Sequence, residues 1–314
     1  MKKNIVPIVF AFDNNIVMPA CVCISSLLMN AEEETFYDIY IICSRKNDLD
    51  TDKLDVLPDI YRNCRITYKE IGNLFKGAFE IRGVTTPTYY RLILPDIMPE
   101  YDKILYADVD ILFRMDLRNV YNIDMSGYYL AATYDLGMNL GTSGQKYINS
   151  VAGLGGDGYF QAGFVLMNIR AMREDGLTKQ FKEMVPGNYR YQDQDILNIV
   201  CKGKIKPLPA MYNMTDYSFY YLEKEPEKLI GRYAVADAYV ARNMSNLHFN
   251  GHKPWKKFSV NFDIWWEYYR KSPVFAPQFY FDFFYDRLNE LDQLSLWKRI
   301  KIFVRYFVYG KRKI

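Results

Sequence analysis

The sequence has few cysteines, few histidines and no long apolar run. Its five cysteines are an odd number and include no Cys-x-x-Cys pair, which favours reduced thiols in a cytosolic protein. No uninterrupted apolar run reaches about 18 residues, so no membrane-spanning helix is expected. Charged and polar residues soon follow the first apolar run, so residues 1–6 are not expected to act as a signal peptide.

The C-terminal end of the chain lacks acids. Seven basic residues and no acid follow Asp292, and because the whole chain carries +3, residues 1–292 carry 3 − 7 = −4. A basic tail behind an acidic body indicates an anionic surface as a partner. On a helix with 3.6 residues per turn, residues 296–309 place apolar side chains on one side and basic ones on the other, which is typical of a helix lying in a membrane interface. The alternative is a helix that packs its apolar side on the rest of the protein.

A glycine-rich nucleotide-binding motif is also missing. No Gly-x-Gly-x-x-Gly follows the first predicted strand, residues 5–12, which weighs against a dinucleotide-binding Rossmann domain. Helical patterns at 18–29 and 49–57 nevertheless alternate with strand patterns at 37–43 and 65–69, and this alternation predicts a doubly wound α/β start.

The middle of the chain continues this pattern less regularly. A helix is predicted at 88–94, and strands at 127–133 and 159–168. The glycine-rich stretch between those strands, 137–158, is predicted to be a long loop that is functional or mobile. Residues 211–225 are predicted to be a second loop. Because loops vary most freely in sequence, both loops are expected to contact the substrate whose identity the sequence does not reveal.

Two acids in an apolar setting are the main candidate for chemistry. Asp108 and Asp110 follow the apolar residues 104–107 and precede a second apolar run. Ligands of open α/β sheets bind beyond the carboxyl ends of strands, and alternate residues of an extended segment point to the same side. Both acids could therefore bind one divalent cation, which would offset the cost of burying them. A structural turn with satisfied hydrogen bonds is an equally good interpretation of this segment alone.

Other polar residues occupy comparable positions. Asp13 and Asn14 end the first strand, where they suit either a base or ribose contact or a helix N-cap. Asp193 precedes an apolar helical run, where acids are electrostatically ordinary. Gln161 stands beside small residues that allow close approach of a ligand, although a β-bulge explains them as well. Both histidines lie within residues 245–255, with His248 between apolar neighbours.

Six blocks, taken together, resemble one family. They comprise residues 8–14, 88–92, 105–110, 159–163, 191–198 and 248–255. In this order they are similar to the family 8 glycosyltransferases, which include bacterial lipopolysaccharide galactosyl- and glucosyltransferases and glycogenin. The resemblance implies a GT-A fold: a Rossmann-like α/β domain with a mixed, nucleotide-binding sheet flanked by helices, here followed by an amphipathic helical tail. Two departures are Gln161, where the family usually has Asn, and a 248–253 segment that is one residue short.

The resemblance also implies roles for the residues of these blocks. Asp108, Asp110 and His248 would bind Mn²⁺, with Mg²⁺ as an alternative, since mixed carboxylate and imidazole ligands suit Mn²⁺. The catalytic set would be Arg91, Asp193 and Gln194 at the donor sugar. The rest of the UDP-sugar site would be Asp13 and Asn14 at the uridine and ribose, Gly251 and Lys253 at the diphosphate, and Val109, Gln161 and Ala162.

The function predicted from this resemblance is a retaining, Mn²⁺-dependent hexosyltransferase. It would move glucose or galactose from UDP-glucose or UDP-galactose to a growing cell-surface glycan that is lipid-linked or protein-linked. A sugar-nucleotide nucleotidyltransferase and a non-catalytic glycan- or lipid-binding protein are the alternatives. We expect a bacterial cytoplasmic protein bound to the inner face of the membrane, with no nucleic-acid partner. The predicted parts are a catalytic domain at 1–260, an aromatic-rich helical extension at 261–292 and a membrane-association tail at 293–314.

Overall fold

The structure is a computed structural model that describes residues 4–75, 77–80, 85–155, 158–229, 244–290 and 292–309. The chain divides into two compact units, residues 1–274 and residues 275–314. Within the described residues, both β-sheets and all of the candidate site residues belong to the first unit.

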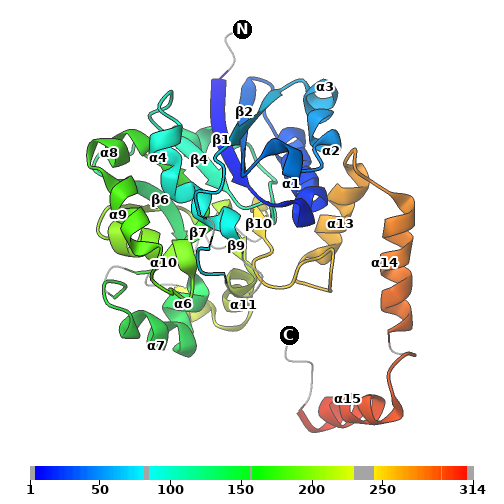
Figure 1. Ribbon diagram of the computed structural model, residues 1–314. Coiled ribbons are helices and arrows are strands. Elements are labelled where there is room, and N and C mark those ends of the chain that lie inside the picture. The colour runs from blue at the N-terminus through cyan, green and yellow to red at the C-terminus, as the bar shows by residue number, and fades with distance from the viewer. Residues whose placement is uncertain are drawn as a thin grey trace. The chain divides into compact units, whose positions relative to one another are not determined.

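The main sheet of the described residues has seven strands (Figure 1). Their order is β3-β2-β1-β4-β7-β6-β8. Strands β1 to β4 run parallel, whereas β7 is antiparallel to both of its neighbours, so the sheet is mixed as expected. The strands are β1 (Asn4–Ala11), β2 (Thr35–Cys43), β3 (Cys64–Glu70), β4 (Ile104–Ala107), β6 (Leu130–Tyr134), β7 (Phe160–Met167) and β8 (Ile205–Pro207).

The central strands are buried along their length. The last six residues of β1 and all residues of β4 and β7 are buried. Strands covered on both faces read as continuous apolar runs, which explains why these segments do not alternate between apolar and polar residues. Strand β1 pairs with β2 on one side and with β4 on the other, so β4 ends in the middle of the sheet.

A second, three-stranded sheet adjoins the end of β4. It consists of β5 (Ile111–Leu112), β10 (Leu247–His248) and β9 (Met214–Thr215), in this order. The chain passes from β4 of the main sheet to β5 of the small sheet through residues 108–110. The two acids of the sequence motif therefore lie at the junction of the sheets, and His248 lies on β10 next to them.

Helices connect the strands. The longest in the first unit, α1, begins with Pro19 in its first turn, where a missing N–H costs nothing. The first-unit α-helices are α1 (Val17–Met29), α2 (Asp52–Asp55), α3 (Leu57–Tyr61), α4 (Leu94–Ile97), α5 (Arg118–Tyr121), α6 (Leu136–Leu140), α7 (Thr142–Ser150), α8 (Ile169–Glu174), α9 (Leu177–Met184), α10 (Gln192–Val200), α11 (Asp216–Lys224) and α13 (Phe262–Lys271). The 3-10 helices are η1 (Asn14–Ile16), η2 (Lys46–Asp48), η3 (Thr86–Ile93), η4 (Ala210–Tyr212) and η5 (Pro226–Leu229).

Both predicted long loops are largely helical, so that prediction is wrong. Residues 136–150 form α6 and α7, and residues 210–224 form η4, β9 and α11. A glycine-rich segment suggests a flexible backbone, but Gly144 is needed here for close packing. A Cβ added there would lie 2.5 Å from the carbonyl oxygen of Gly137. Asp135 caps α6 by accepting a hydrogen bond from the Met138 amide. The helix predicted at 88–94 is also different in kind, because most of it is the 3-10 helix η3.

The second unit contains two helices among its described residues, α14 (Pro277–Asn289) and α15 (Leu296–Tyr309). Helix α15 covers the residues for which an amphipathic helix was predicted. Among the helices that the structure describes, none is long and apolar enough to cross a membrane.

Candidate active site

The two acids of the motif are fixed by different strands. The Asp108 amide donates a hydrogen bond of 2.8 Å to the Gly163 carbonyl on β7. The Asp110 carbonyl accepts one of 3.0 Å from the Phe249 amide, which follows β10. Because each backbone is tied to a different sheet, the two side chains meet where the sheets join. Val109, between them, is buried.

His248 completes a group of three potential metal ligands. Its Nδ1 lies 3.0 Å from Asn213 Oδ1, and the Asn213 amide nitrogen contacts the Thr133 hydroxyl at 3.4 Å. Because Asn213 Oδ1 is an acceptor, Nδ1 carries the proton in this contact, and Nε2 is the nitrogen left to bind a metal. Nε2 faces Asp110 Oδ1 at 3.2 Å. Two acceptors at that distance repel each other unless a proton or a cation lies between them.

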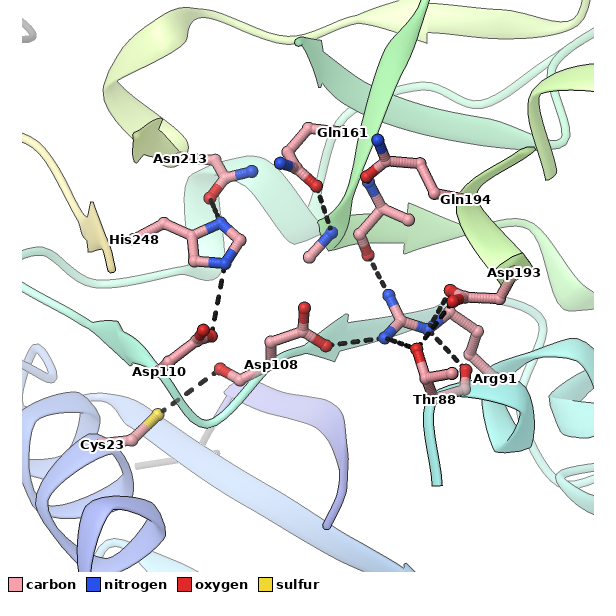
Figure 2. Close-up of polar contacts among 12 residues, drawn as sticks. Cys23, Thr88, Arg91, Asp108, Asp110, Gln161, Asp193, Gln194, Asn213 and His248 are labelled. Carbon is pink, nitrogen blue, oxygen red and sulfur yellow. Dashed lines mark hydrogen bonds and ion pairs between the residues drawn. The ribbon is translucent and has the colours of Figure 1, made fainter. Parts of the chain in front are cut away.

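The three residues fit a divalent cation. One ligand atom from each of Asp108, Asp110 and His248 can be chosen so that all lie within 4.8 Å of one another (Figure 2). Within the described part of the chain, the buried Asp110 Oδ1 accepts no hydrogen bond. Space for the group depends on Gly163, where an added Cβ would lie 2.3 Å from His248 Cε1 and 2.9 Å from Asp108 Oδ2.

Lys253 reaches this group in spite of the shortened segment. Its ammonium donates hydrogen bonds to Asp110 Oδ2 and to the Phe249 carbonyl. The side chain keeps 30% of its surface exposed. A cation that is already beside the metal ligands is well placed to contact a bound anion as well.

Arg91 forms the other half of the site. It is 3% exposed and bridges two carboxylates, with Nη2 2.7 Å from Asp108 Oδ1 and Nε 2.9 Å from Asp193 Oδ2. Its Nη1 donates to the Ala162 carbonyl, and the guanidinium lies 4.1 Å from the centre of the Tyr106 ring. Burial alone would lower the pKa of Arg91, but these two carboxylates keep it well above its ordinary value.

Asp193 is held by an unusual backbone. Gln192, at the start of α10, has a φ of +46°, which a residue with a side chain rarely adopts. The Thr88 hydroxyl donates a hydrogen bond of 2.6 Å to Asp193 Oδ1. Burial raises the pKa of Asp193 to about 6, although Arg91 and Thr88 oppose the shift. Strain of this kind persists where surrounding contacts impose it, often at functional sites.

The Gln194 amide is fully oriented. Its Oε1 accepts from the Ala162 amide at 2.9 Å, and its Nε2 donates to Asp135 Oδ2 at 3.2 Å. Gln161, on the same strand as Ala162, accepts from the Gly163 amide at 3.2 Å. Figure 2 shows Gln161 and Gln194 on one side of the Arg91–Asp108 ion pair, with Asp193 beside Arg91.

Sequence reasoning missed three polar residues that support this group. Asn213 orients His248, and Asp135 receives the Gln194 amide. Asp195 is fully buried and accepts from the Tyr147 and Tyr159 hydroxyls and the Tyr191 amide. Asp135 directly follows a strand, as Asp108 does, and this position could have identified it as a candidate site residue. Nothing in the sequence around Asn213 indicates its contact with His248.

Three of the predicted site residues lie apart from these hydrogen bonds. Asp13 caps η1 by accepting from the Asn15 amide at 2.9 Å, and it also accepts from the Thr85 hydroxyl. Asn14 Oδ1 accepts from the Asp50 amide at 2.7 Å. Both follow β1, which neighbours β4 in the sheet. Gly251 follows β10, and an added Cβ there would lie 2.5 Å from Asp216 Oδ2.

The sequence matches one protein-family model, glycosyl transferase family 8, over residues 7–259. The chain belongs to this family. This glycosyltransferase is 27% identical over 281 residues to a Haemophilus influenzae protein described as a glycosyltransferase, covering 85% of this chain and 83% of the relative. It is 24% identical to a lipopolysaccharide 1,2-glucosyltransferase of Escherichia coli, covering 84% and 78%.

A solved structure agrees with the fold of this glycosyltransferase. The galactosyltransferase LgtC, crystallised with donor and acceptor sugar analogues, superimposes with a TM-score of 0.69 at 23% identity. The match covers 87% of this chain and 98% of LgtC. The predicted GT-A fold and the family resemblance are therefore both confirmed. A glycosyltransferase needs an activated donor sugar and an acceptor, and the polar group between the two sheets is the candidate place for their reaction.

Proposed function

We propose that this glycosyltransferase is a retaining, Mn²⁺-dependent hexosyltransferase that uses UDP-galactose or UDP-glucose. The observation that supports this best is the proximity of two groups. The carboxylates of Asp108 and Asp110 and the His248 imidazole can meet one cation, and the Arg91–Asp193 pair joins them through Asp108. A cation site thus adjoins a buried polar group that suits a sugar.

Asp108, Asp110 and His248 would hold the cation. Two carboxylates and an imidazole suit Mn²⁺ better than Ca²⁺, which prefers oxygen ligands alone. When bound, the ion would neutralise the charge that develops on the departing diphosphate. Lys253 already lies beside Asp110, and in the proposal its ammonium contacts the same diphosphate. Gly251 and Val109 would contribute backbone contacts, and Asp13 and Asn14 would bind the uridine and ribose.

The donor sugar would lie between Arg91, Asp193 and Gln194. Positive charge develops on the sugar ring as the anomeric C–O bond breaks, and the ionised Asp193 stabilises it electrostatically. Gln194 is a poor covalent nucleophile, and both ends of its amide already have partners. Asp195 is fully buried, and three hydrogen-bond donors already surround its carboxylate. Gln161 and Ala162 would line the sugar pocket.

We therefore favour attack by the acceptor hydroxyl on the face from which UDP leaves, which retains the anomeric configuration. The acceptor oxygen forms the new bond to the anomeric carbon, and the electron pair of the broken C–O bond departs with UDP. The hydroxyl proton passes to the diphosphate oxygen that leaves. This route requires no free carboxylate beside the anomeric carbon.

The acceptor in this proposal is a growing cell-surface glycan such as lipopolysaccharide, and the enzyme works at the inner face of the bacterial membrane. The names of the relatives support the acceptor class. Helix α15 supports the location: Leu296, Trp297 and Phe303 are exposed, Trp297 to 80%, and Lys298 and Lys301 lie on the same helix. Each basic residue near an anionic surface contributes on the order of 1 kcal/mol.

Donor turnover tests the catalytic proposal. Purified protein is incubated with UDP-galactose or UDP-glucose in Mn²⁺ or in EDTA, and released UDP is measured without an acceptor. We expect slow, Mn²⁺-dependent hydrolysis of one donor in preference to the other. UDP release that persists in EDTA would contradict the metal assignment. Binding of glycans without any turnover of either donor would favour a non-catalytic binding protein.

Deletion of residues 293–314 tests the membrane proposal. The truncated protein is expected to remain folded, to keep donor hydrolysis, and to stop sedimenting with vesicles that contain anionic lipid. Neutral vesicles are the control. If the truncation lowers the melting temperature strongly or causes aggregation, the tail is part of the protein core and the membrane proposal is wrong.

A further inference from the structure

The first turn of α11 presents an acid and an aromatic ring next to the site. Asp216 is the first residue of this nine-residue helix, and Tyr217 is the second. Each rests against a glycine from another segment: Gly251 under Asp216, and Gly137 under Tyr217. Sequence reasoning treated this region as a loop and assigned neither side chain a role.

The Asp216 carboxylate is partly buried. Throughout the described residues, it forms no hydrogen bond and no ion pair. Burial raises its pKa, although the nearby His248, His252 and Lys253 oppose the shift. The carboxylate is only partly buried, so it can accept hydrogen bonds from a ligand that binds beside it.

The Tyr217 ring packs on the backbone of Gly137 and is otherwise largely exposed. A Cβ added at Gly137 would lie 2.8, 3.0 and 3.1 Å from three atoms of the ring, so the ring lies flat on the bare glycine backbone. The side chain nevertheless keeps 54% of its surface exposed. A large aromatic ring fixed on one side and open on the other is a surface on which a second ring can stack.

These two side chains adjoin segments that carry residues of the candidate active site. Thr215, the residue before Asp216, pairs with the proposed metal ligand His248 in the small sheet. Gly137, under Tyr217, follows Asp135 by two residues, and Asp135 receives the Gln194 amide. The α11 shelf, as we call Asp216 and Tyr217, thus adjoins the proposed diphosphate side through Gly251 and the donor-sugar side through Gly137.

We propose that the α11 shelf binds the acceptor as a pyranose ring, whose C–H face stacks on Tyr217 while its hydroxyls donate hydrogen bonds to Asp216. This proposal rests on the hexosyltransferase function proposed above. A pyranose combines an apolar face with a rim of O–H donors, which matches an open ring beside an acceptor-only carboxylate. A lipid chain offers no donors to Asp216.

The shelf also explains why two glycines stand where they do. A side chain at position 251 would displace the Asp216 carboxylate, and one at position 137 would push the Tyr217 ring out of place. The shelf is therefore fixed by packing against the same segments that carry the proposed donor contacts. An acceptor sugar bound to it is held close to the bond that must break.

Saturation-transfer NMR tests the proposal with methyl β-D-galactopyranoside and methyl β-D-glucopyranoside in the presence of UDP and Mn²⁺. The variants are Tyr217→Ala, Tyr217→Phe and Asp216→Asn. The control is Tyr220→Ala, one turn further along α11, because Tyr220 is 48% exposed and donates to Glu225 at 3.0 Å. UDP signals in the same sample report the donor side separately.

We expect at least one glycoside to bind the unaltered protein, with saturation reaching its ring protons. Tyr217→Ala should raise its Kd about tenfold, as the loss of roughly 50–60 Å² of buried apolar surface implies. Asp216→Asn should weaken binding by a similar factor, whereas Tyr217→Phe and Tyr220→Ala should change it less than twofold. UDP binding should persist in all variants.

Three results would overturn the shelf proposal alone. Glycoside binding that is unchanged in Tyr217→Ala would show that the ring is not the platform. A loss of UDP signals in Tyr217→Ala that matches the loss of glycoside signals would place the ring at the nucleotide. If the unaltered protein binds UDP but binds neither glycoside, a pyranose shelf is excluded and the donor proposal stays intact. Absence of UDP binding in the unaltered protein would instead reject the hexosyltransferase proposal itself, and the shelf with it.

Discussion

Gly163→Ala is the sharpest test of the proposed metal site, because it adds a single methyl group and removes no ligand. Gly163 lies within β7, opposite the acids, and its carbonyl accepts the Asp108 amide. The new Cβ would lie 2.3 Å from His248 Cε1 and 2.9 Å from Asp108 Oδ2. Two of the three proposed ligands must therefore move at once.

The size of the effect follows from these distances. Ordinary contact begins at 3.4 Å, so the imidazole must retreat by about 1.1 Å and the carboxylate oxygen by about 0.5 Å. A metal site tolerates changes of only about 0.2 Å in ligand distance. The imidazole cannot retreat freely, since β10 is paired on both edges and Asn213 holds Nδ1. We expect Mn²⁺ affinity to fall about 10- to 100-fold, with a loss of stability of about 1–3 kcal/mol from overpacking.

The assay is a Mn²⁺ titration of donor hydrolysis, or calorimetry in the presence of UDP, beside a thermal melt. Gly155→Ala is the matched control, because an added Cβ there meets no atom within 4 Å. It should leave the Mn²⁺ midpoint unchanged. A folded Gly163→Ala variant with the Mn²⁺ midpoint of the unaltered protein would refute the assignment of these ligands.

Three further predictions concern the neighbouring residues. Asp110→Asn should lower transfer by about 10²-fold or more, as for other groups that stabilise developing charge, and steady-state rates at low Mn²⁺ check this. Asp193 must be ionised to stabilise the sugar, and its pKa is raised to about 6, so kcat should fall tenfold per pH unit below about 6. Asp193→Asn should be slow and should lack this acidic limb; the same limb in that variant would assign it to another group. Gln194→Ala should lower kcat while calorimetry shows UDP affinity within about twofold, and an equal loss of both would contradict its placement at the sugar.

Much of the donor half of the site could be predicted from the sequence, because its residues depend on strand ends. The apolar run before Asp108 predicts a buried strand, and the structure has β4 there. A strand end fixes the direction of the next residues without any long-range information. The ion pairs that join Arg91 to both Asp108 and Asp193 could not be predicted this way, since they connect η3, the residue that follows β4, and α10.

The wrong predictions have a common physical cause. Local composition cannot distinguish a glycine that frees the backbone from one that admits a neighbour. Gly144 has an ordinary backbone conformation but stands against Gly137 and Met138, so α6 and α7 pack through it. The strained Gln192 is the reverse case. Its φ is positive, but the residue is not a glycine, so nothing in the sequence indicates this backbone conformation. Both facts depend on tertiary packing, which single-sequence patterns do not contain.

The residues proposed to bind the donor and the metal could be predicted from the sequence. Those proposed to bind the acceptor could not. A diphosphate and a metal impose fixed chemistry, which only a few residue types can satisfy, so Asp108, Asp110 and Lys253 stand in readable motifs. An acceptor sugar imposes shape, which many side chains can supply from helices packed in many ways. Asp216 and Tyr217 acquire their proposed role only because Gly251 and Gly137 lie beneath them. In this proposal, acceptor choice is a property of packing, and it is to be sought in α6 and α11.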